Sequence, residues 1–400
     1  MIPILITPVI TRLYSIEAIG VLAIFVSITS ILGVVFPAGL EQAVILPKSQ
    51  RRANRVVTLA FTSVAVMTLL VALGLFAFKT LWPENSVFRD LGMFIWIIPP
   101  VTACIASVNV LNQLHLRKSR IKEIANGTIA KFISLGSVQI VLGWIGAVGG
   151  GLVWGRVTSN IVQLIYLAKR IDFRHFRSSQ SELMLTLRRY KKFPLFNIWG
   201  SLANISAIYM VAVLIALFYG TGEAGEFALM QRVLVIPVFL IGQAFGQIYY
   251  KQIVSEKIQM GNGRQAYLKS LAALTLFSIL IFGSIYLFGT RAIDVFLGEK
   301  VSNVSTYVEI LVPMFFIRFI ASPLSMTLNA FERQEVNMLW QLSLLFSIIG
   351  VFIVAQQLQH DLPQLLRSYS VVVSIMYVIQ LILTYKVASR GSVGLKAGQA

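Results

Sequence analysis

The sequence predicts an all-α polytopic membrane protein with about 12 transmembrane helices in two six-helix lobes. Eleven apolar stretches follow one another with short polar joints between them, and roughly 20 apolar residues are enough for a helix to span a bilayer. Hydrophobic residues make up 57% of the 400 residues and charged residues only 12%, about half the charged fraction of a soluble domain. Open sheet edges cannot be satisfied in lipid, so the spans are predicted to be helices.

Each apolar stretch predicts one span. The segment Met1–Ile10 is apolar but would reach only about 15 Å as a helix, half a bilayer. We therefore expect it to be the second half of a first span, with either a truncated helix or a coding start that lies further upstream, and with it the count is twelve. The full spans are predicted at residues 18–39, 56–78, 91–112, 124–146, 147–168, 193–219, 226–248, 268–289, 305–328, 337–355 and 366–386.

Positively charged residues predict the orientation of the spans. Most of the 34 lysines and arginines fall in alternate joints. Lys131 lies near the start of the predicted span at 124–146, and we count it with the inner joint before that span. Joints rich in these residues lie on the cytoplasmic side of membrane proteins, so both termini are predicted to be cytoplasmic. The net charge of +18 follows from this topology, and no nucleic-acid partner is expected.

A long basic joint at residues 169–192 divides the predicted spans six and six. We therefore expect an N-terminal lobe at residues 1–180, with helices 1–6, and a C-terminal lobe at residues 181–400, with helices 7–12. The segment Ile105-Ala106-Ser107 matches Ile320-Ala321-Ser322, in spans six apart. This match favours a parallel internal repeat of the kind that several transporters contain.

Enzymatic and cofactor chemistry has little support in this sequence. The single cysteine, Cys104, lies in a span and the three histidines are expected in loops, so no metal site is predicted. No P-loop motif for ATP hydrolysis is present. Every outer joint is too short for a folded catalytic domain. We expect a protein that is not an enzyme and that needs no cofactor.

Basic residues within the spans are the candidate substrate-binding groups. Arg156 lies in the sixth span and Arg318 near the middle of the tenth, where an ionisable side chain costs about 2.5–3.5 kcal/mol on insertion scales. Both are expected either to line a cavity or to bond to backbone carbonyls. Arg232 in the eighth span is a further candidate, with snorkelling to the interface as the alternative. Arg12 closes the first helix and is either a binding residue or an interfacial anchor.

The sign of these charges predicts the class of substrate. The spans hold basic groups and almost no acids, and Glu309, near the outer end of the tenth span, is expected to be a solvated helix end. A cation exporter usually needs carboxylates inside the membrane, whereas arginine binds phosphate with two parallel hydrogen bonds. The sequence therefore favours an anionic substrate that carries phosphate or pyrophosphate.

Prolines within the spans are candidate hinges. Each proline removes a helix hydrogen bond and can kink the helix, which helps helices to line a cavity and to bend around it. Proline is also common in transmembrane helices in general, and that reading stays open. The candidates are Pro99, Pro100, Pro237, Pro313 and Pro323.

Longer motifs in both halves of the chain resemble one family. The first half contains Pro8-Val-Ile-Thr-Arg-Leu-Tyr-Ser15 and Glu41-Gln-Ala-Val-Ile-Leu-Pro-Lys-Ser49. The second half contains Ala224-Gly225-Glu-Phe-Ala-Leu-Met-Gln-Arg232, and Ser322-Pro323-Leu followed by Glu332-Arg-Gln334. In their order and spacing these motifs resemble Wzx-type O-antigen and polysaccharide flippases, a polysaccharide transporter family of the multidrug/oligosaccharidyl-lipid/polysaccharide exporter superfamily.

The resemblance implies a substrate and a mechanism. Similar flippases have a cationic central cavity and move undecaprenyl-pyrophosphate-linked oligosaccharide, such as an O-antigen or another surface polysaccharide repeat unit, from the inner to the outer leaflet. By position, Arg12, Glu41, Arg232 and Arg318 fall in the matching segments and are implied to bind substrate, whereas Arg156 rests on the local sequence alone. Similar proteins have about half a helix more before Pro8.

The resemblance also implies a location and partners. The expected location is the bacterial cytoplasmic (inner) membrane, and the expected partners are lipid-linked oligosaccharide, membrane lipid and other polysaccharide assembly proteins. Three alternatives stay open. A multidrug antiporter of the same superfamily would share the two-lobe plan, and a lipid II flippase would share the substrate chemistry. A membrane polysaccharide polymerase would need a large outer loop, which this chain lacks.

Overall fold

The computed structural model describes residues 2–81, 90–147, 150–172, 176, 179–191, 193–297 and 302–390. Within these ranges the regular structure is helical, with no strand. Nine helices of this described part are long and apolar enough to cross a membrane. Each of the eleven predicted spans falls on a helix, so the predicted fold class is confirmed.

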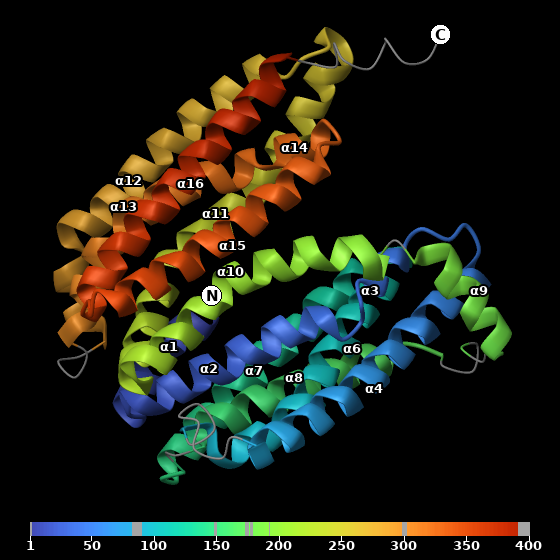
Figure 1. The fold of residues 1–400 in the computed structure, drawn as a ribbon, viewed down its shortest axis with the longest axis horizontal. Coiled ribbons are helices and arrows are strands. Elements are labelled where there is room, and N and C mark those ends of the chain that lie inside the picture. Colours follow the sequence, from blue (N-terminus) through green and yellow to red (C-terminus); the bar gives the residue numbers. More distant parts are fainter. Residues whose placement is uncertain are drawn as a thin grey trace. The chain divides into compact units, whose positions relative to one another are not determined.

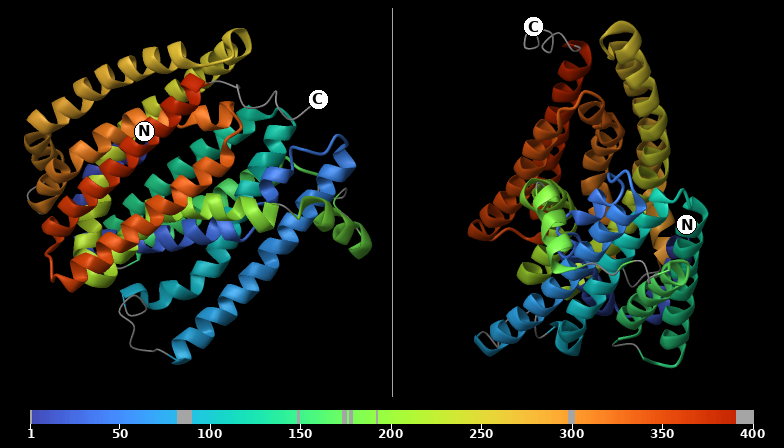
Figure 2. Two further views of the ribbon diagram at one scale, coloured as in Figure 1. Left: turned by 45° about the horizontal axis from the view of Figure 1, so that its top comes forward. Right: turned by 90° about the vertical axis from the view of Figure 1, so that its right-hand side faces the viewer.

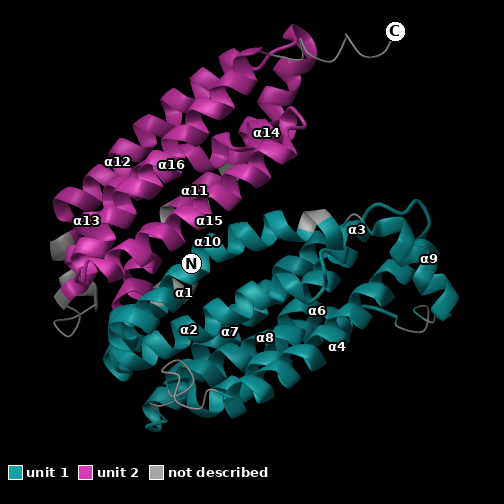
Figure 3. Cartoon of the chain, in the orientation of Figure 1, with its two compact units in different colours: residues 1–225 teal, residues 226–400 magenta. Residues whose placement is uncertain are grey.

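The chain divides by its internal contacts into two compact units, residues 1–225 and residues 226–400 (Figure 3). The boundary falls in the first turns of α11 (Thr221–Met260). This division does not test the lobes that we expect at residues 1–180 and 181–400, which stay a prediction.

Unit 1 is built around α6 (Ile98–Arg117), which packs against α2, α4 and α8 (Figure 1). Helix α7 lies along α8 and also contacts α1, while α10 lies along α2. The remaining elements of this unit are α1 (Ile2–Leu13), α2 (Ile16–Val35), α3 (Leu40–Ala43), α4 (Gln50–Leu81), η1 (Gly92–Ile97), α7 (Ile121–Trp144), α8 (Gly151–Ala168), α9 (Gln180–Tyr190), η3 (Phe193–Asn197) and α10 (Ile198–Tyr219).

Polar side chains tie the helices of unit 1 together through backbone carbonyls. Tyr14 donates its hydroxyl to the carbonyl of Gln139 (2.6 Å), and the Gln139 amide donates to the carbonyl of Leu152 (3.0 Å). His115 was expected in a loop, but it is buried in α6, where its Nε2 lies 3.1 Å from the carbonyl oxygen of Leu167 in α8. Such bonds satisfy polar groups that would otherwise be buried without a partner.

The long basic joint contains a helix that hydropathy alone does not reveal. Helix α9 begins with a capping box, in which the Ser179 hydroxyl accepts from the Glu182 backbone N–H and the Glu182 carboxylate accepts from the Ser179 N–H. The Glu182 carboxylate also pairs with Arg55 of α4 and, at 3.8 Å, with Arg51. These contacts attach the basic joint to the first turns of α4.

Unit 2 has α13 (Ser302–Leu324) between α12 and α16 (Figure 1, Figure 2). Helix α15 packs against α16, and α14 contacts both of these helices. The hydroxyl oxygens of Tyr249 in α11 and Thr327 in α14 are hydrogen-bonded at 2.6 Å, and both residues are fully buried. The other elements of this unit are α12 (Arg264–Leu297), α14 (Met326–Ala330), α15 (Gln334–Gln357) and α16 (Leu362–Arg390).

Candidate functional site

Helix α8 carries a stripe of polar side chains into unit 1. Arg156, Asn160 and Gln163 are spaced four and three residues apart, so they share one face of the helix. Asn160 and Gln163 are buried, and Arg156 is partly buried. Three atoms of this stripe, Arg156 Nε, Asn160 Oδ1 and Gln163 Oε1, are buried without a hydrogen-bond partner among the described residues. A helix face of this kind can still accept a polar ligand.

Lys131 adds a second cation to this part of unit 1. It lies ten residues after the first residue of α7, about 15 Å along the helix, and its side chain is partly buried. The charge of Arg156 in α8 acts on Lys131, Lys131 and the Cys104 thiol of α6 act on each other, and Tyr209 of α10 acts on Arg156. Assigning Lys131 to an inner joint was therefore wrong, since the residue belongs to the interior of a span. We call Lys131 and Arg156 the cationic pair.

The cationic pair is an unusual arrangement inside a helix bundle. Two like charges in a medium of low dielectric repel each other more strongly than they do in water. Arg156 forms no ion pair with a carboxylate of the described residues. A bound anion would relieve both the repulsion and the missing hydrogen bond of Arg156 Nε.

Arg318 in unit 2 has a different environment. Its guanidinium carbon lies 5.5 Å from the ring centroid of Phe315 and 6.0 Å from that of Tyr377. Tyr377 in turn packs against Trp340, with ring centroids 5.4 Å apart, and the charge of Arg318 also acts on the buried Tyr369. Aromatic faces stabilise a cation by roughly 0.5–2 kcal/mol each, so the protein itself already provides for this charge.

The other predicted binding residues are Arg12, Arg232 and Glu41. Arg12 is exposed in the last turn of α1, where a positive charge favours the helix dipole. Arg232 is partly buried in α11 and has an interaction partner within the protein. Glu41 lies in α3 and lines a separate polar cavity. Their roles in binding substrate stay predictions.

The candidate hinge prolines fall in three settings. Pro99 and Pro100 lie in the first turn of α6, directly after the 3-10 helix η1, so their missing N–H groups remove no hydrogen bond from the helix interior. Pro313 and Pro323 lie inside α13, as the sequence predicts. The side chain of Pro237 lies outside the described residues. Hinge motion at these positions stays a prediction.

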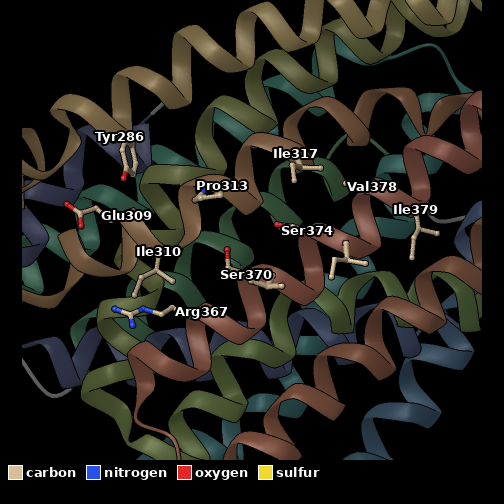
Figure 4. Close-up of a pocket in the computed structure, with 12 residues that line it drawn as sticks. Tyr286, Glu309, Ile310, Pro313, Ile317, Arg367, Ser370, Ser374, Val378 and Ile379 are labelled. Atoms are coloured by element: carbon tan, nitrogen blue, oxygen red, sulfur yellow. The ribbon is translucent and has the colours of Figure 1, made fainter.

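A groove on unit 2 is lined mainly by apolar side chains of α12, α13 and α16 (Figure 4). Its volume is about 750 Å³, and Pro313 and Ile317 lie on its α13 side. Glu309 and Arg367 lie toward one end of the groove in Figure 4, so Glu309 is part of a lined surface and not only a solvated helix end. Neither Arg318 nor Arg232 lines the groove. Its chemistry suits hydrocarbon better than a sugar.

A family model described as polysaccharide biosynthesis protein matches residues 9–306, well over half of the chain. The protein belongs to this polysaccharide biosynthesis family. The family predicted from the sequence motifs is therefore confirmed. A comparison with curated protein sequences finds no significant match.

Several solved structures share the fold of this chain. A lipid II flippase, MurJ, in an inward closed conformation superposes with a TM-score of 0.76 at 13% identity, covering 96% of this chain and 85% of the flippase. An inward-facing multidrug resistance transporter of the MATE family gives 0.71 at 14% identity, covering 96% and 93%. A transporter of the MOP superfamily from Pyrococcus furiosus, described as having a binding pocket of reversed polarity, gives 0.60 at 14% identity, covering 96% and 91%. At these identities the likeness establishes the shared fold.

Proposed function

We propose that this protein is a flippase that moves undecaprenyl-pyrophosphate-linked oligosaccharide from the inner to the outer leaflet of the bacterial cytoplasmic membrane. The cargo would be an O-antigen or another surface polysaccharide repeat unit. No covalent bond is made or broken, so the protein acts by alternating access and not as an enzyme. The two lobes that exchange access would be residues 1–180 and 181–400, with both termini cytoplasmic.

The observation that carries this proposal is the cationic pair. Lys131 and Arg156 lie inside unit 1 without a carboxylate partner among the described residues, and Arg156 Nε lacks a hydrogen bond. A pyrophosphate carries several acceptor oxygens and negative charge, so it can satisfy an arginine and a lysine at once. Membership of the polysaccharide biosynthesis family supports a sugar on the other side of the pyrophosphate.

The same observation weighs against the rival functions. A multidrug antiporter binds cationic substrates, and two positive charges in the binding region would repel such substrates. A lipid II flippase would use the same pyrophosphate chemistry, so only the sugar distinguishes it from our proposal. Other polysaccharide assembly proteins are proposed as partners, because a flipped repeat unit must be polymerised on the other side of the membrane.

Mass spectrometry of lipid-linked sugars, with leaflet assignment, tests the proposal in a strain that lacks the gene. We expect complete repeat units to accumulate on the inner leaflet and surface polymer to be lost, with both restored by the wild-type gene. Single units accumulating on the outer leaflet would instead indicate a polymerase. Unchanged lipid-linked sugars and unchanged polymer would contradict the proposal.

A further inference from the structure

Unit 1 contains a second polar site, a cavity of about 450 Å³ where α3 meets the last turns of α6. Its lining is Glu41, Gln42, Ile45, Asn109, Asn112 and Gln113. Four of these six side chains are carboxamides and one is a carboxylate, so we call it the carboxamide cavity. None of the described residues that line it is basic.

The two walls of the cavity are held in place by local structure. Ala38 and Gly39 have positive φ angles of 54° and 71°, which turn the chain sharply after α2 and set the direction of α3. Arg117 of α6 then holds the segment after α3, because its guanidinium donates to the carbonyl of Ile45 at 2.8 Å and of Val44 at 3.4 Å. On the α6 wall, Asn112 and Gln113 lie three and four residues after Asn109, so both share a helix face with it.

The cavity has hydrogen-bonding capacity that the protein leaves unused. Glu41 Oε2 and Asn112 Oδ1 are buried and have no partner among the described residues. Burial raises the pKa of the Glu41 carboxyl to about 7, so this group can be protonated near neutral pH and can then donate as well as accept. A ligand that brings hydroxyl groups would satisfy these atoms.

The mixture of donors and acceptors identifies the class of ligand. A metal cation would satisfy the carboxylate and carbonyl oxygens but would offer no acceptor to the amide N–H groups of Asn109, Asn112 and Gln113. A phosphate group would be disfavoured beside Glu41, because the described lining offers no basic residue to pair with it. Sugar hydroxyls both donate and accept, and about 450 Å³ falls in the usual range for small-molecule sites, roughly 300–1,000 Å³.

We propose that the carboxamide cavity binds a sugar residue of the lipid-linked oligosaccharide, while the cationic pair binds its pyrophosphate. This inference rests on the proposed function. In the predicted topology α3 and the end of α6 lie on the cytoplasmic side, where the oligosaccharide is loaded. The cavity then provides selectivity for the sugar, which the cationic pair cannot supply because every such substrate carries the same pyrophosphate.

Protection of an introduced cysteine tests this assignment. Asn109→Cys in a Cys104→Ser background is purified into nanodiscs, and its rate of maleimide labelling is measured with two lipids. One is undecaprenyl pyrophosphate and the other is the same lipid carrying a single N-acetylhexosamine. We expect the sugar-bearing lipid to slow labelling at least about fivefold and the bare lipid to have no effect. Leu116→Cys, exposed on the same helix, is the matched control and should be unaffected by either lipid.

A second variant tests the cavity without an introduced cysteine, which could itself alter the site. Asn112→Leu removes an amide without changing charge, and native mass spectrometry compares its affinity for the same two lipids. We expect the preference for the sugar-bearing lipid to fall at least about tenfold, with binding of the bare lipid unchanged. Equal protection by both lipids, or an unchanged preference in Asn112→Leu, would overturn the assignment. If deletion of the gene abolishes flipping but the sugar-bearing lipid does not protect the cysteine, only the cavity assignment is refuted. If the sugar-bearing lipid protects the cysteine but deletion of the gene leaves flipping unchanged, only the proposed function is refuted.

Discussion

Arg156 and Arg318 both lie well inside a helix, yet the two units surround them differently. In unit 1 Arg156 acts against a second cation, Lys131, and its Nε has no partner among the described residues. In unit 2 Arg318 lies against the rings of Phe315 and Tyr377. Arg156 therefore keeps the capacity to bind an anion, whereas Arg318 is already stabilised by aromatic neighbours. Function and stability should therefore separate between the two positions.

The largest expected effect comes from neutralising the cationic pair. The double variant Lys131→Gln with Arg156→Gln keeps polar side chains at both positions but removes both charges. Because charge-assisted hydrogen bonds contribute about 1.5–3 kcal/mol each, surface polymer made by a complemented deletion strain should fall at least about 100-fold. The melting temperature should not fall, since a repulsion is removed.

Lys122→Gln is the matched control for the double variant, because Lys122 is exposed nine residues earlier on the same helix. It should leave surface polymer at the wild-type level. A wild-type level of surface polymer in the double variant would show that transport does not depend on the cationic pair.

An added methyl group should be tolerated less well at Gly20 in unit 1 than at Gly246 in unit 2. A methyl group at Gly20 would overlap the backbone carbonyl of Thr221, whereas one at Gly246 would lie 3.8 Å from Pro323, an ordinary contact. Gly20→Ala should therefore lower the free energy of unfolding by about 1–3 kcal/mol or more, as overpacking does. Gly246→Ala should be neutral or slightly stabilising, because alanine is the better helix former. Thermal unfolding of the two purified variants checks this, and equal losses would contradict it.

Arg318 should affect stability more than transport. Arg318→Leu loses two cation–π contacts, which predicts a loss of about 1–3 kcal/mol in the free energy of unfolding, while Arg318→Lys should retain most of it. Export should fall less than tenfold in either variant. An Arg318→Leu protein that melts like the wild type but exports nothing would show that Arg318, like Arg156, binds the substrate directly.

The smallest effect concerns Glu41 and pH. Its carboxyl has a folded pKa of about 7 against an ordinary value of 4.5, so the folded state binds the proton more tightly than the unfolded state does. The free energy of unfolding should therefore fall as pH rises from about 4.5 to 7. Melting curves at pH 5.5 and 7.5 should show this fall for the wild type, and Glu41→Gln should reduce it. An identical pH dependence in the variant would show that Glu41 is not the responsible group.

The fold was predictable from the sequence because hydrophobic length alone predicts a membrane helix. Every predicted span coincides with a helix, although α2 ends at Val35 instead of residue 39, where positive φ angles at Ala38 and Gly39 turn the chain. Helix α9 was missed because a short amphipathic helix in a basic joint has no such signal. Its capping box, Ser179 with Glu182, was the cue in the sequence.

The sites were harder to predict because they depend on which helix faces meet. Arg156 could be singled out as a charge in a span, but Lys131 was assigned to a joint because it lies near a cluster of loop lysines and arginines. Its position ten residues into α7, beyond Glu123 and Asn126, was the available signal. The aromatic contacts of Arg318 join α13 to α16, which no local pattern reveals. The carboxamide cavity likewise joins α3 to α6, some seventy residues apart in the chain.

Binding of undecaprenyl pyrophosphate, measured by native mass spectrometry, shows most directly whether the cationic pair holds the pyrophosphate. Wild-type protein is compared with the Lys131→Gln, Arg156→Gln double variant and with Arg318→Lys, all purified and folded. We expect the double variant to bind at least about 100-fold more weakly, a loss of about 2.7 kcal/mol, and Arg318→Lys to change affinity less than about fivefold. Equal binding by the wild type and the double variant would contradict the claim that the cationic pair holds the pyrophosphate.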